Sequence, residues 1–477
     1  MSIIEALKKI EREKLTSFHV PGHKNGRLLE GLPYGNAIGS YDTTEIPGTD
    51  NLHAPEGALL EAESRISDFY GSKESHLLVN GTTSGIISMI YGAFQPGDKV
   101  IISRDAHKSV FTGVILAHLE PIYIMPEVDE ALGMTLGVTR STIEEAYSLH
   151  EDIKGVVLTY PNYHGICTDL QSISVLVHER GGVLLVDGAH AAHFNLSKTL
   201  PTTAIEGGAD VVVHSTHKSL PAFTQSSLIH RCTDRVSAAR LRMALAMFQS
   251  SSPSYLLMAS LENAVMVAQS EGERRMMHLL VLLESYSQII EKNTVFKILK
   301  AAHLPQGFFL DRTKLTLLMG DSALTGGALE TRLREKYGLQ CEYGTDSMVL
   351  FIMSIATTEE DLLRLYEALY AISQEISVEK KREDGVKHYD FKRFQQTTGI
   401  KPSEAVYRDR ILVDLKDAIG SCAGDFIVPY PPGVPILVPG EVISEQVVNY
   451  IEDGHRKGYN INGVFKNEKL QVNIIRG

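Results

Sequence analysis

A lysine follows directly on an apolar stretch near the middle of the chain, in Val213-His214-Ser215-Thr216-His217-Lys218-Ser219. An amine at the end of a buried strand is partly desolvated, which favours its neutral, nucleophilic form. Ser215, His217 and the neighbouring backbone N–H groups are suited to hold a phosphate. Taken alone, Lys218 is more often an exposed surface lysine, so its interpretation depends on the residues that accompany it.

A second apolar stretch ends in an aspartate, in Val183-Leu184-Leu185-Val186-Asp187-Gly188-Ala189-His190, 31 residues before the lysine. A carboxylate at such a strand end can pair with the protonated ring nitrogen of a heteroaromatic cofactor and keep that ring an electron sink. Ala189 is small enough for a flat ring to pack against it. Considered singly, Asp187 is equally well a helix or loop cap.

Two further turns follow predicted strands. Asn80-Gly81-Thr82-Thr83-Ser84-Gly85 opens a helix, and its N–H groups and hydroxyls are typical of a phosphate cradle, although an ordinary helix cap is the commoner role. No GxxxxGK[ST] motif is present, which excludes a P-loop. Arg104-Asp105-Ala106-His107-Lys108-Ser109 brings an imidazole that can stack on an aromatic cofactor, although a lone histidine more often has a structural role.

Two pairs of histidines suggest a metal site as the alternative to a cofactor site. His190 and His193 form one pair, and His214 and His217 form another. Both pairs flank predicted strand ends and share no established helix face, and their spacing is not diagnostic of a metal. We therefore expect no metal.

The elements that position these residues alternate between strands and helices. Short apolar runs separated by helices predict an α/β fold with a mainly parallel sheet, whose ligands lie at the carboxyl ends of the strands. We expect strands at 76–80, 99–103, 121–125, 155–160, 183–187 and 211–214, and helices at 58–70, 84–94 and 170–180. Ile3, Leu7 and Ile10 predict an amphipathic N-terminal helix, 236–292 predict long helices interrupted at 249–254, 358–372 predict another helix, and 378–402 predict a charged connector.

Composition limits the class of partner. The chain of 477 residues has 46 lysines and arginines against 58 aspartates and glutamates, a formal net charge of −12, which disfavours nucleic acid. The cysteines at 167, 232, 341 and 422 form no CxxC pair, which favours a reducing cytoplasm. No signal peptide and no apolar stretch near the roughly 20 residues of a membrane span are present, so no membrane association is expected.

Three separated motifs resemble those of the ornithine/lysine/arginine decarboxylase family, and the likeness spans nearly the whole chain. The lysine motif continues as Ala222-Phe223-Thr224-Gln225-Ser226-Ser227. His19-Val20-Pro21-Gly22-His23-Lys24-Asn25-Gly26 resembles the N-terminal signature of the family, and Pro432-Gly433-Val434-Pro435 with Pro439-Gly440-Glu441 resembles its C-terminal one.

The resemblance implies a fold-type-I, pyridoxal-phosphate (PLP)-dependent transferase-like major domain with a mainly parallel seven-stranded sheet, followed by smaller α+β C-terminal domains. It suggests four segments: an N-terminal helix and loop that contributes to the active site (1–57), a PLP-binding domain (58–295), a small α+β domain (296–377), and a linker with the C-terminal decarboxylase domain (378–477).

The resemblance also implies a role for each site residue. Lys218 binds PLP covalently, Asp187 pairs with its ring nitrogen, and His107 stacks on its ring. The other implied cofactor contacts are Thr82, Thr83, Ala189, His190, Ser215, His217 and, from the partner subunit of a homodimer, its Ser252. Acidic residues should select a cationic side chain through charge-assisted hydrogen bonds. Candidates for substrate contact are His23, Asp42, Glu45, Asp50 and Glu441.

Only 18 residues precede the N-terminal signature, so the chain resembles the short members of the family, which lack an N-terminal wing domain. That subgroup is linked to polyamine synthesis, and arginine, which would give agmatine and CO₂, is the expected substrate. Lysine and ornithine, giving cadaverine and putrescine, remain alternatives. The residues around Lys218 are equally compatible with another PLP enzyme such as an aminotransferase.

Overall fold

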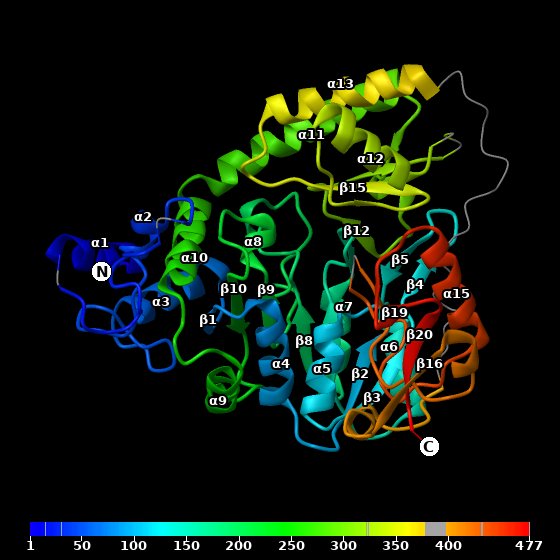
Figure 1. Ribbon diagram of the computed structural model, residues 1–477, viewed down its shortest axis with the longest axis horizontal. Coiled ribbons are helices and arrows are strands. Elements are labelled where there is room, and N and C mark those ends of the chain that lie inside the picture. Colours follow the sequence, from blue (N-terminus) through cyan, green and yellow to red (C-terminus); the bar gives the residue numbers. More distant parts are fainter. Residues whose placement is uncertain are drawn as a thin grey trace. The chain divides into compact units, whose positions relative to one another are not determined.

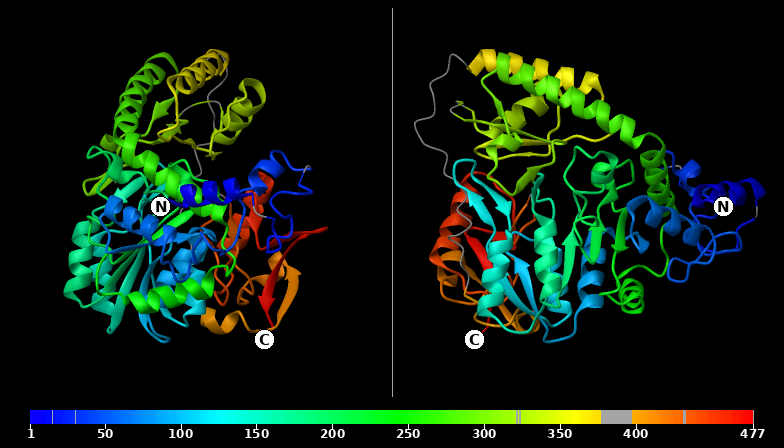
Figure 2. Two further views of the ribbon diagram at one scale, coloured as in Figure 1. Left: turned by 90° about the vertical axis from the view of Figure 1, so that its left-hand side faces the viewer. Right: turned by 180° about the vertical axis from the view of Figure 1, so that it is seen from behind.

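The computed structural model describes residues 1–14, 16–29, 31–320, 322, 324–376, 397–430 and 433–476 (Figures 1 and 2). The chain divides into two compact units. The first unit comprises Met1–Ala93, Val183–Glu284 and Met353–Leu362, and the second comprises Phe94–Gly182, Ser285–Ile352 and Leu363–Gly477. Most of the predicted connector at 378–402 lies outside the described residues, and the division into four functional segments stays a prediction.

The central sheet has seven strands in the order β1-β10-β9-β8-β6-β2-β3. Its strands are β1 (Glu74–Leu78), β10 (Ser227–Arg231), β9 (Val211–His214) and β8 (Val183–Asp187) in the first unit, and β6 (Ile153–Thr159), β2 (Lys99–Ser103) and β3 (Glu120–Ile124) in the second. The pairs β8–β9, β2–β6 and β2–β3 are parallel, whereas β10 runs antiparallel to both of its neighbours. The predicted α/β class and mainly parallel sheet are confirmed.

Helices of the first unit bury the apolar faces that their sequence periodicity predicts. They are α1 (Ile3–Glu13), α2 (Gly35–Gly39), α3 (Ala58–Tyr70), α4 (Gly81–Ala93), α8 (Thr216–Ser219), α9 (Ala238–Phe248) and α10 (Tyr255–Val267). Ser2 and Glu5 form a capping box at the start of α1. Ile3 and Leu7 then pack in one core cluster with Leu59 of α3 and Met258 of α10, so the predicted amphipathic helix is confirmed.

The second unit contains smaller sheets, each with its own helix. The strands β11 (Lys297–Ile298), β13 (Lys314–Leu318), β15 (Met348–Ile352) and β14 (Tyr343–Gly344) form one sheet, and α12 (Gly326–Tyr337) contacts β14 and β15. The strands β16 (Arg410–Asp414), β20 (Leu470–Ile475) and β19 (Val464–Lys466) form another, and residues of α15 (Glu445–Arg456) share its core.

The remaining elements connect or flank these sheets. In the second unit the helices are α5 (Lys108–Leu116), α6 (Arg140–Leu149), α7 (Leu170–Glu179) and α14 (Pro402–Ala405), and the short strands are β4 (Glu127–Asp129), β5 (Met134–Gly137), β7 (Ile166–Thr168), β12 (Phe308–Leu310), β17 (Val428–Pro429) and β18 (Ile461–Asn462). The long helices α11 (Glu273–Asn293) and α13 (Glu359–Ile376) confirm the helical predictions for those stretches.

The strands β1, β3 and β6 are shifted by one or two residues from the predicted bounds, and two further differences have a physical cause. The helix α4 begins at Gly81 and not at Ser84, because the Gly-Thr-Thr turn forms its first turn. The strand β10 was not predicted, although all five of its residues are buried. Its Ser227 and His230 satisfy their polar atoms through hydrogen bonds to distant residues, so no apolar pattern marks the strand.

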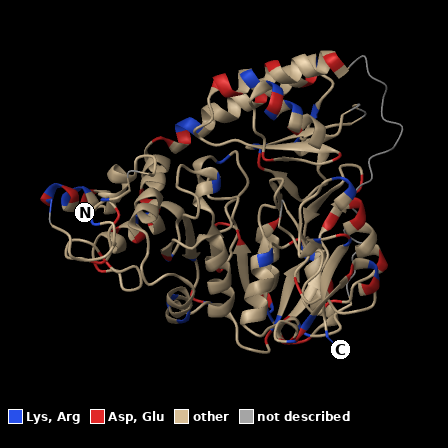
Figure 3. Ribbon diagram, viewed as in Figure 1, with Lys and Arg blue, Asp and Glu red and all other residues tan. Residues whose placement is uncertain are grey.

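Charged residues of both signs are interspersed along exposed helices such as α1 and α15 (Figure 3). Among the described residues, no helix combines the length and apolar character needed to cross a bilayer.

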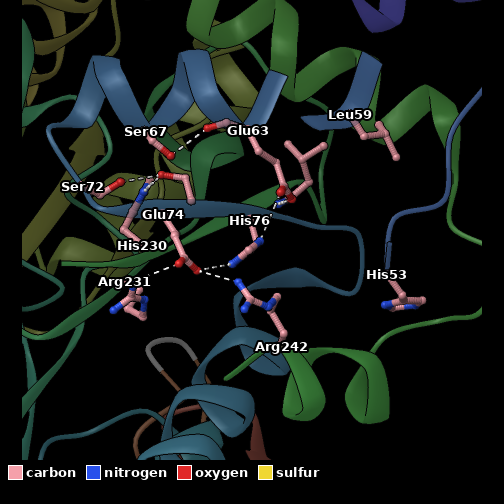
Figure 4. Close-up of polar contacts among 12 residues, drawn as sticks. His53, Leu59, Glu63, Ser67, Ser72, Glu74, His76, His230, Arg231 and Arg242 are labelled. Carbon is pink, nitrogen blue, oxygen red and sulfur yellow. Dashed lines mark hydrogen bonds and ion pairs between the residues drawn. The ribbon is translucent and has the colours of Figure 1, made fainter. Parts of the chain in front are cut away.

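On the outer strand β1, Glu74 and His76 form an ionic cluster with Glu63 of α3, Arg231 of β10 and Arg242 of α9, here called the edge cluster (Figure 4). His76 lies between two carboxylates, with its Nδ1 3.2 Å from Glu63 and its Nε2 3.6 Å from Glu74. Glu74 also binds both arginines, at 2.8 and 3.1 Å. Charges on an outer strand oppose unwanted pairing with another chain.

The edge cluster generates a pH-dependent stability. Burial opposes protonation of His76, but Glu63 and Glu74 outweigh it and raise the pKa of the imidazole to about 9. Because this pKa exceeds the unfolded value of 6.5, protonated His76 stabilises the fold fully below pH 6.5, and the contribution disappears as pH rises through about 9. We expect His76→Gln to lower the free energy of unfolding at pH 6 by up to about 3 kcal/mol and to have little effect at pH 10.

Urea unfolding of both proteins at the two pH values measures this difference. His53→Gln is the matched control, because His53 lies in the same region and its imidazole Nε2 lies 2.9 Å from the Ser250 carbonyl oxygen and not beside a carboxylate. A cost of His76→Gln that is equal at pH 6 and pH 10 would contradict the assignment.

Candidate active site

The carboxyl ends of two adjacent parallel strands in the first unit carry the predicted aspartate and lysine. Strands β8 and β9 pair in parallel with Asp187 opposite Val213. β9 ends one residue later, and the one-turn helix α8 then carries His217 and Lys218. Parallel pairing therefore brings together at one sheet edge two residues that are 31 positions apart in the sequence.

Asp187 is a buried carboxylate with 2% of its surface exposed. Its Oδ1 accepts one hydrogen bond, 3.1 Å long, from the backbone N–H of Ala189. Burial raises the pKa of Asp187, and the positive charge of Lys218 partly counters that rise. A further cationic hydrogen-bond donor would strongly favour the ionised form of this buried carboxylate. The protonated nitrogen of a pyridine ring is such a donor.

Lys218 differs from the expectation of a buried amine, because its side chain is exposed. The one-turn helix α8 leaves most of the side chain outside the sheet, while its Nζ lies 3.1 Å from Nε2 of the buried His190. An imidazole at hydrogen-bond distance can exchange a proton with the amine. The arrangement gives an accessible nucleophile with a proton acceptor beside it.

Hydroxyl groups gather where α4 begins. Thr82 Oγ1 contacts Ser215 Oγ, and lies 2.9 Å from Ser227 Oγ. The amino-terminal N–H groups and the dipole of this 13-residue helix favour an anion. The structure thus brings together the predicted Thr82 and Ser215 and adds Ser227, while Thr83 is exposed in the same turn.

His217 contributes differently from the expectation. Its Nδ1 lies 2.8 Å from the Ser226 carbonyl oxygen and donates to it, so in the neutral ring Nε2 carries only a lone pair. Burial, and then the charge of Lys218, lower the pKa of His217. Only the protonated form of His217 would donate a hydrogen bond to a phosphate from Nε2.

This set of groups fits PLP, which presents an aldehyde, a phosphate and a pyridine nitrogen. An amine, a hydroxyl-lined helix N-terminus and a buried carboxylate match the three in turn. Thr216 Oγ1 and Ser219 Oγ, which flank Lys218, are also buried without a hydrogen-bond partner in the described part of the chain. Such atoms gain from a polar ligand at the site.

The metal alternative is disfavoured by the contacts of these histidines. His190 Nε2 faces the Lys218 amine, and His214 Nδ1 lies 3.1 Å from Nε2 of His230. Across the described residues, no group of three or more side chains has the arrangement of a metal site.

The N-terminal loop holds three of the predicted substrate residues. His23 Nδ1 accepts the N–H of Gly26 at 2.9 Å, which leaves the proton of a neutral ring on Nε2, 3.2 Å from Asp42. Glu45 is exposed nearby in sequence. Ser252 is exposed in the loop between α9 and α10, where the helical interruption was predicted.

Two predicted substrate carboxylates form contacts within the fold. Asp50 accepts the N–H groups of Gly57 and Leu59, at 2.7 and 3.1 Å, and so caps the start of α3. Glu441 in the second unit is fully buried, and lies 2.9 Å from the Arg104 guanidinium. Burial raises the pKa of Glu441, and the positive charge of Arg104 partly counters that rise. Both carboxylates thus have partners within the fold, and their contact with a cationic substrate stays a prediction.

His107 belongs to the second unit, where it caps the N-terminus of α5. Its Nδ1 lies 2.8 Å from Ser109 Oγ and accepts the Ser109 N–H at 3.2 Å. The residue lines a cavity of about 380 Å³ together with Lys108, Tyr430, Gly433 and Asn462. Its predicted stacking role stays a prediction.

A line of buried polar groups in the first unit was not predicted. Ser75 Oγ lies 2.8 Å from His230 Nδ1, and His230 reaches His214, the last residue of β9. Burial and the nearby His193 lower the pKa of His214 to about 3, so its imidazole is neutral. No local sequence signal marks this line, because its members come from three strands and meet only through sheet pairing.

Comparisons with known proteins agree with the resemblance to the decarboxylase family. The family profile described as "Orn/Lys/Arg decarboxylase, major domain" matches residues 2–361, and the corresponding "C-terminal domain" profile matches residues 391–465. An arginine decarboxylase of Bacillus subtilis is 32% identical over 98% of this chain and 96% of its own length. An inducible lysine decarboxylase of Escherichia coli is 24% identical over 93% of this chain and 75% of its own.

A solved structure shares the fold. The lysine decarboxylase LdcF of Francisella novicida superposes with a TM-score of 0.85 at 20% identity, covering 99% of this chain and 81% of that one. At this identity the similarity shows the fold alone.

The burial of Asp187 predicts a trade between stability and ligand binding. Because the pKa of Asp187 in the folded chain is raised above its unfolded value, the ligand-free protein loses stability as pH rises through that interval. Asp187→Asn removes the buried charge, so we expect a ligand-free variant that is more stable than the parent at pH 7 and binds PLP at least 100-fold more weakly.

Urea midpoints between pH 4 and 8 and a spectroscopic PLP titration measure the two effects. A variant that binds PLP as tightly as the parent would refute the assigned role of Asp187. Asp42→Asn, which removes a partly exposed carboxylate of the same unit, is the control and should leave PLP binding unchanged.

Proposed function

The chain belongs to the Orn/Lys/Arg decarboxylase family, and from that premise we propose that it converts L-arginine to agmatine and CO₂ with PLP as cofactor. The observation that carries the proposal is the position of two residues, a buried Asp187 and an accessible Lys218, at the carboxyl ends of two adjacent parallel strands. The family assignment identifies the enzyme as an amino-acid decarboxylase and disfavours the aminotransferase alternative.

When bound, PLP withdraws electrons from the substrate Cα as its carboxylate leaves. Lys218 would hold the cofactor covalently, and Thr82, Ser215 and the N-terminus of α4 would hold its phosphate. Ala189 and His190 would lie at the ring, together with His107 of the second unit. Thr83 and protonated His217 are further phosphate donors in this proposal.

Asp187 acts by charge. Its low exposure keeps water from screening it, so the ionised carboxylate strongly favours a protonated ring nitrogen. The raised pKa of the ligand-free carboxyl falls once that cation is in place. The protein therefore supplies a fixed negative charge where the ring must stay positive.

Lys218 and His190 act on protons. Replacing a carboxylate by hydrogen consumes one proton for each substrate: arginine plus H⁺ gives agmatine plus CO₂. Once the Lys218 amine is free of the cofactor it can deliver that proton to the substrate Cα, and His190, 3.1 Å away, can recharge it. A neutral His190 would also accept a proton from the Lys218 ammonium and so keep the amine nucleophilic.

The preference for arginine is supported by the relatives. The curated arginine decarboxylase matches at 32% identity over almost the full chain, against 24% for the lysine enzyme. Asp42 and Glu45 are the carboxylates with exposed surface that we retain for the substrate cation, with His23 fixing the orientation of Asp42. Charge-assisted hydrogen bonds to a guanidinium suit this choice.

We further propose a homodimer in which Ser252 of the partner subunit approaches the phosphate. The N-terminal segment exposes large apolar side chains, with Phe18 and Leu28 at 91% and Tyr34 at 84%. Apolar groups gathered in one exposed segment are typical of a protein interface. The exposed Ser252 is compatible with a contact across that interface.

The four free cysteines agree with a cytoplasmic location.

Incubation of the PLP-loaded protein with arginine, lysine or ornithine tests the reaction. We expect CO₂ and agmatine from arginine, with kcat/KM at least 10-fold above that for lysine or ornithine, and a borohydride-stable label on the peptide containing Lys218. Lys218→Ala should lose at least 10³-fold in kcat, because it removes both the covalent anchor and the proton donor. Formation of a keto acid without CO₂ would sink the proposal.

Mixing two inactive variants tests the shared site. If Ser252 acts across the dimer, a heterodimer of Lys218→Ala with Ser252→Glu contains one intact site. Random re-association of equal amounts makes half of all dimers mixed, so we expect about a quarter of the parental activity. Parallel mixing of Lys218→Ala with Lys218→Arg is the control and should restore nothing. No recovery in the first mixture would place Ser252 outside the partner's site.

A further inference from the structure

Within the second unit, the C-terminal segment 433–441 is bonded to the strand-end segment 104–109. Arg104 donates to the carbonyls of Pro435 and Ile436, at 3.2 and 3.3 Å, and pairs with Glu441 at 2.9 Å. Its guanidinium also lies 5.3 Å from the ring centre of Phe111. Arg104 is 3% exposed and Glu441 is fully buried, so this seam between the two segments is dry and geometrically fixed.

At one end of the seam, Gly433 meets His107. The Gly433 carbonyl accepts the N–H of Lys108, the first residue of α5, at 3.1 Å. A Cβ on Gly433 would lie 3.0 Å from Cδ2 and 3.1 Å from Nε2 of the His107 imidazole, closer than carbon atoms normally approach. The backbone of Gly433 therefore lies against one edge of that ring, and only glycine leaves the space.

The opposite edge of the same ring is held by Ser109. Its hydroxyl lies 2.8 Å from Nδ1, and its N–H donates to the same nitrogen. Contacts on both edges resist rotation about the side-chain torsions, whereas the two faces of an imidazole are the surfaces that stack on another ring. Holding a ring by its edges is the arrangement that a stacking residue requires.

We propose that Gly433 is a positioning residue that holds His107 in the orientation needed for stacking on the cofactor. The inference rests on the proposed function, because it assigns His107 to the cofactor ring. The contact between Gly433 and the His107 imidazole also gives the C-terminal signature motif a role that does not depend on the substrate.

The test compares two glycines of the second unit with the same backbone conformation. Gly433 has φ +87° and would crowd His107, whereas Gly420 has φ +82° and nothing within 4 Å of its added Cβ. Alanine strains the backbone at both positions, so the difference between Gly433→Ala and Gly420→Ala isolates the contact with the ring.

The measurements are the PLP dissociation constant from absorbance titration, the circular dichroism of the bound cofactor in the visible band, and the unfolding temperature without PLP. We expect Gly433→Ala to weaken PLP binding about 10-fold or more and to change the visible dichroism, since small misplacements at a site have large effects. Gly420→Ala should lower the unfolding temperature similarly and keep PLP affinity within 2-fold of the parent.

Ser109→Ala keeps the test decisive if Gly433→Ala does not fold. It removes the hydroxyl from the other edge of the ring, and should change the visible dichroism in the same direction with a smaller loss of affinity. Parental affinity and dichroism in Gly433→Ala, or equal losses in Gly433→Ala and Gly420→Ala, would overturn the proposal. A parent protein that binds no PLP would instead overturn the proposed function, so the two failures are distinguishable.

Discussion

The burial of the Asp187 carboxylate is the constraint around which the first unit is organised. A charge at the end of a covered strand loses most of its hydration, and one backbone N–H replaces little of it. The sheet can hold such a group only if its surroundings supply positive potential. Lys218 supplies part of it, and the N-terminus of α4 separately favours an anion beside Ser215. The fold thereby creates an affinity for a ligand that carries both a cation and an anion.

The architecture of the sheet serves this constraint. Parallel pairing of β8 and β9 sets their carboxyl ends side by side, which fixes Asp187 relative to α8. The antiparallel β10 then adds the hydroxyl of Ser227 to the cluster of hydroxyl side chains around Thr82. His214 at the end of β9 and His230 of β10 place neutral imidazoles in the core, 3.1 Å apart, so the strand that leads to Lys218 is anchored by a hydrogen bond as well as by apolar packing.

Much of this arrangement is predictable from sequence, and the failures share one cause. Strands β2, β8 and β9 have the predicted bounds, because runs of Val, Ile and Leu ending in polar residues mark a buried parallel strand. The sequence does not predict the contacts that Asp50 and Glu441 make within the fold, because a carboxylate suits a helix cap, a buried ion pair or a substrate equally well. What decides among them is a partner distant in sequence, and Arg104 lies 337 residues from Glu441.

The two buried carboxylates, Asp187 and Glu441, show how structure separates a functional acid from a structural one. Burial raises the pKa of both. Glu441 pairs with a guanidinium at 2.9 Å and accepts the Val438 N–H at 2.7 Å, both through Oε2, so a cation within the protein counters its charge, although Oε1 has no hydrogen-bond partner in the described part of the chain. In the described part of the chain, Asp187 has no ion pair within 4.0 Å and accepts a single N–H. Lys218 counters only part of the cost of burying Asp187. The fold therefore sacrifices stability at this strand end, and a ligand that carries a cation can restore it.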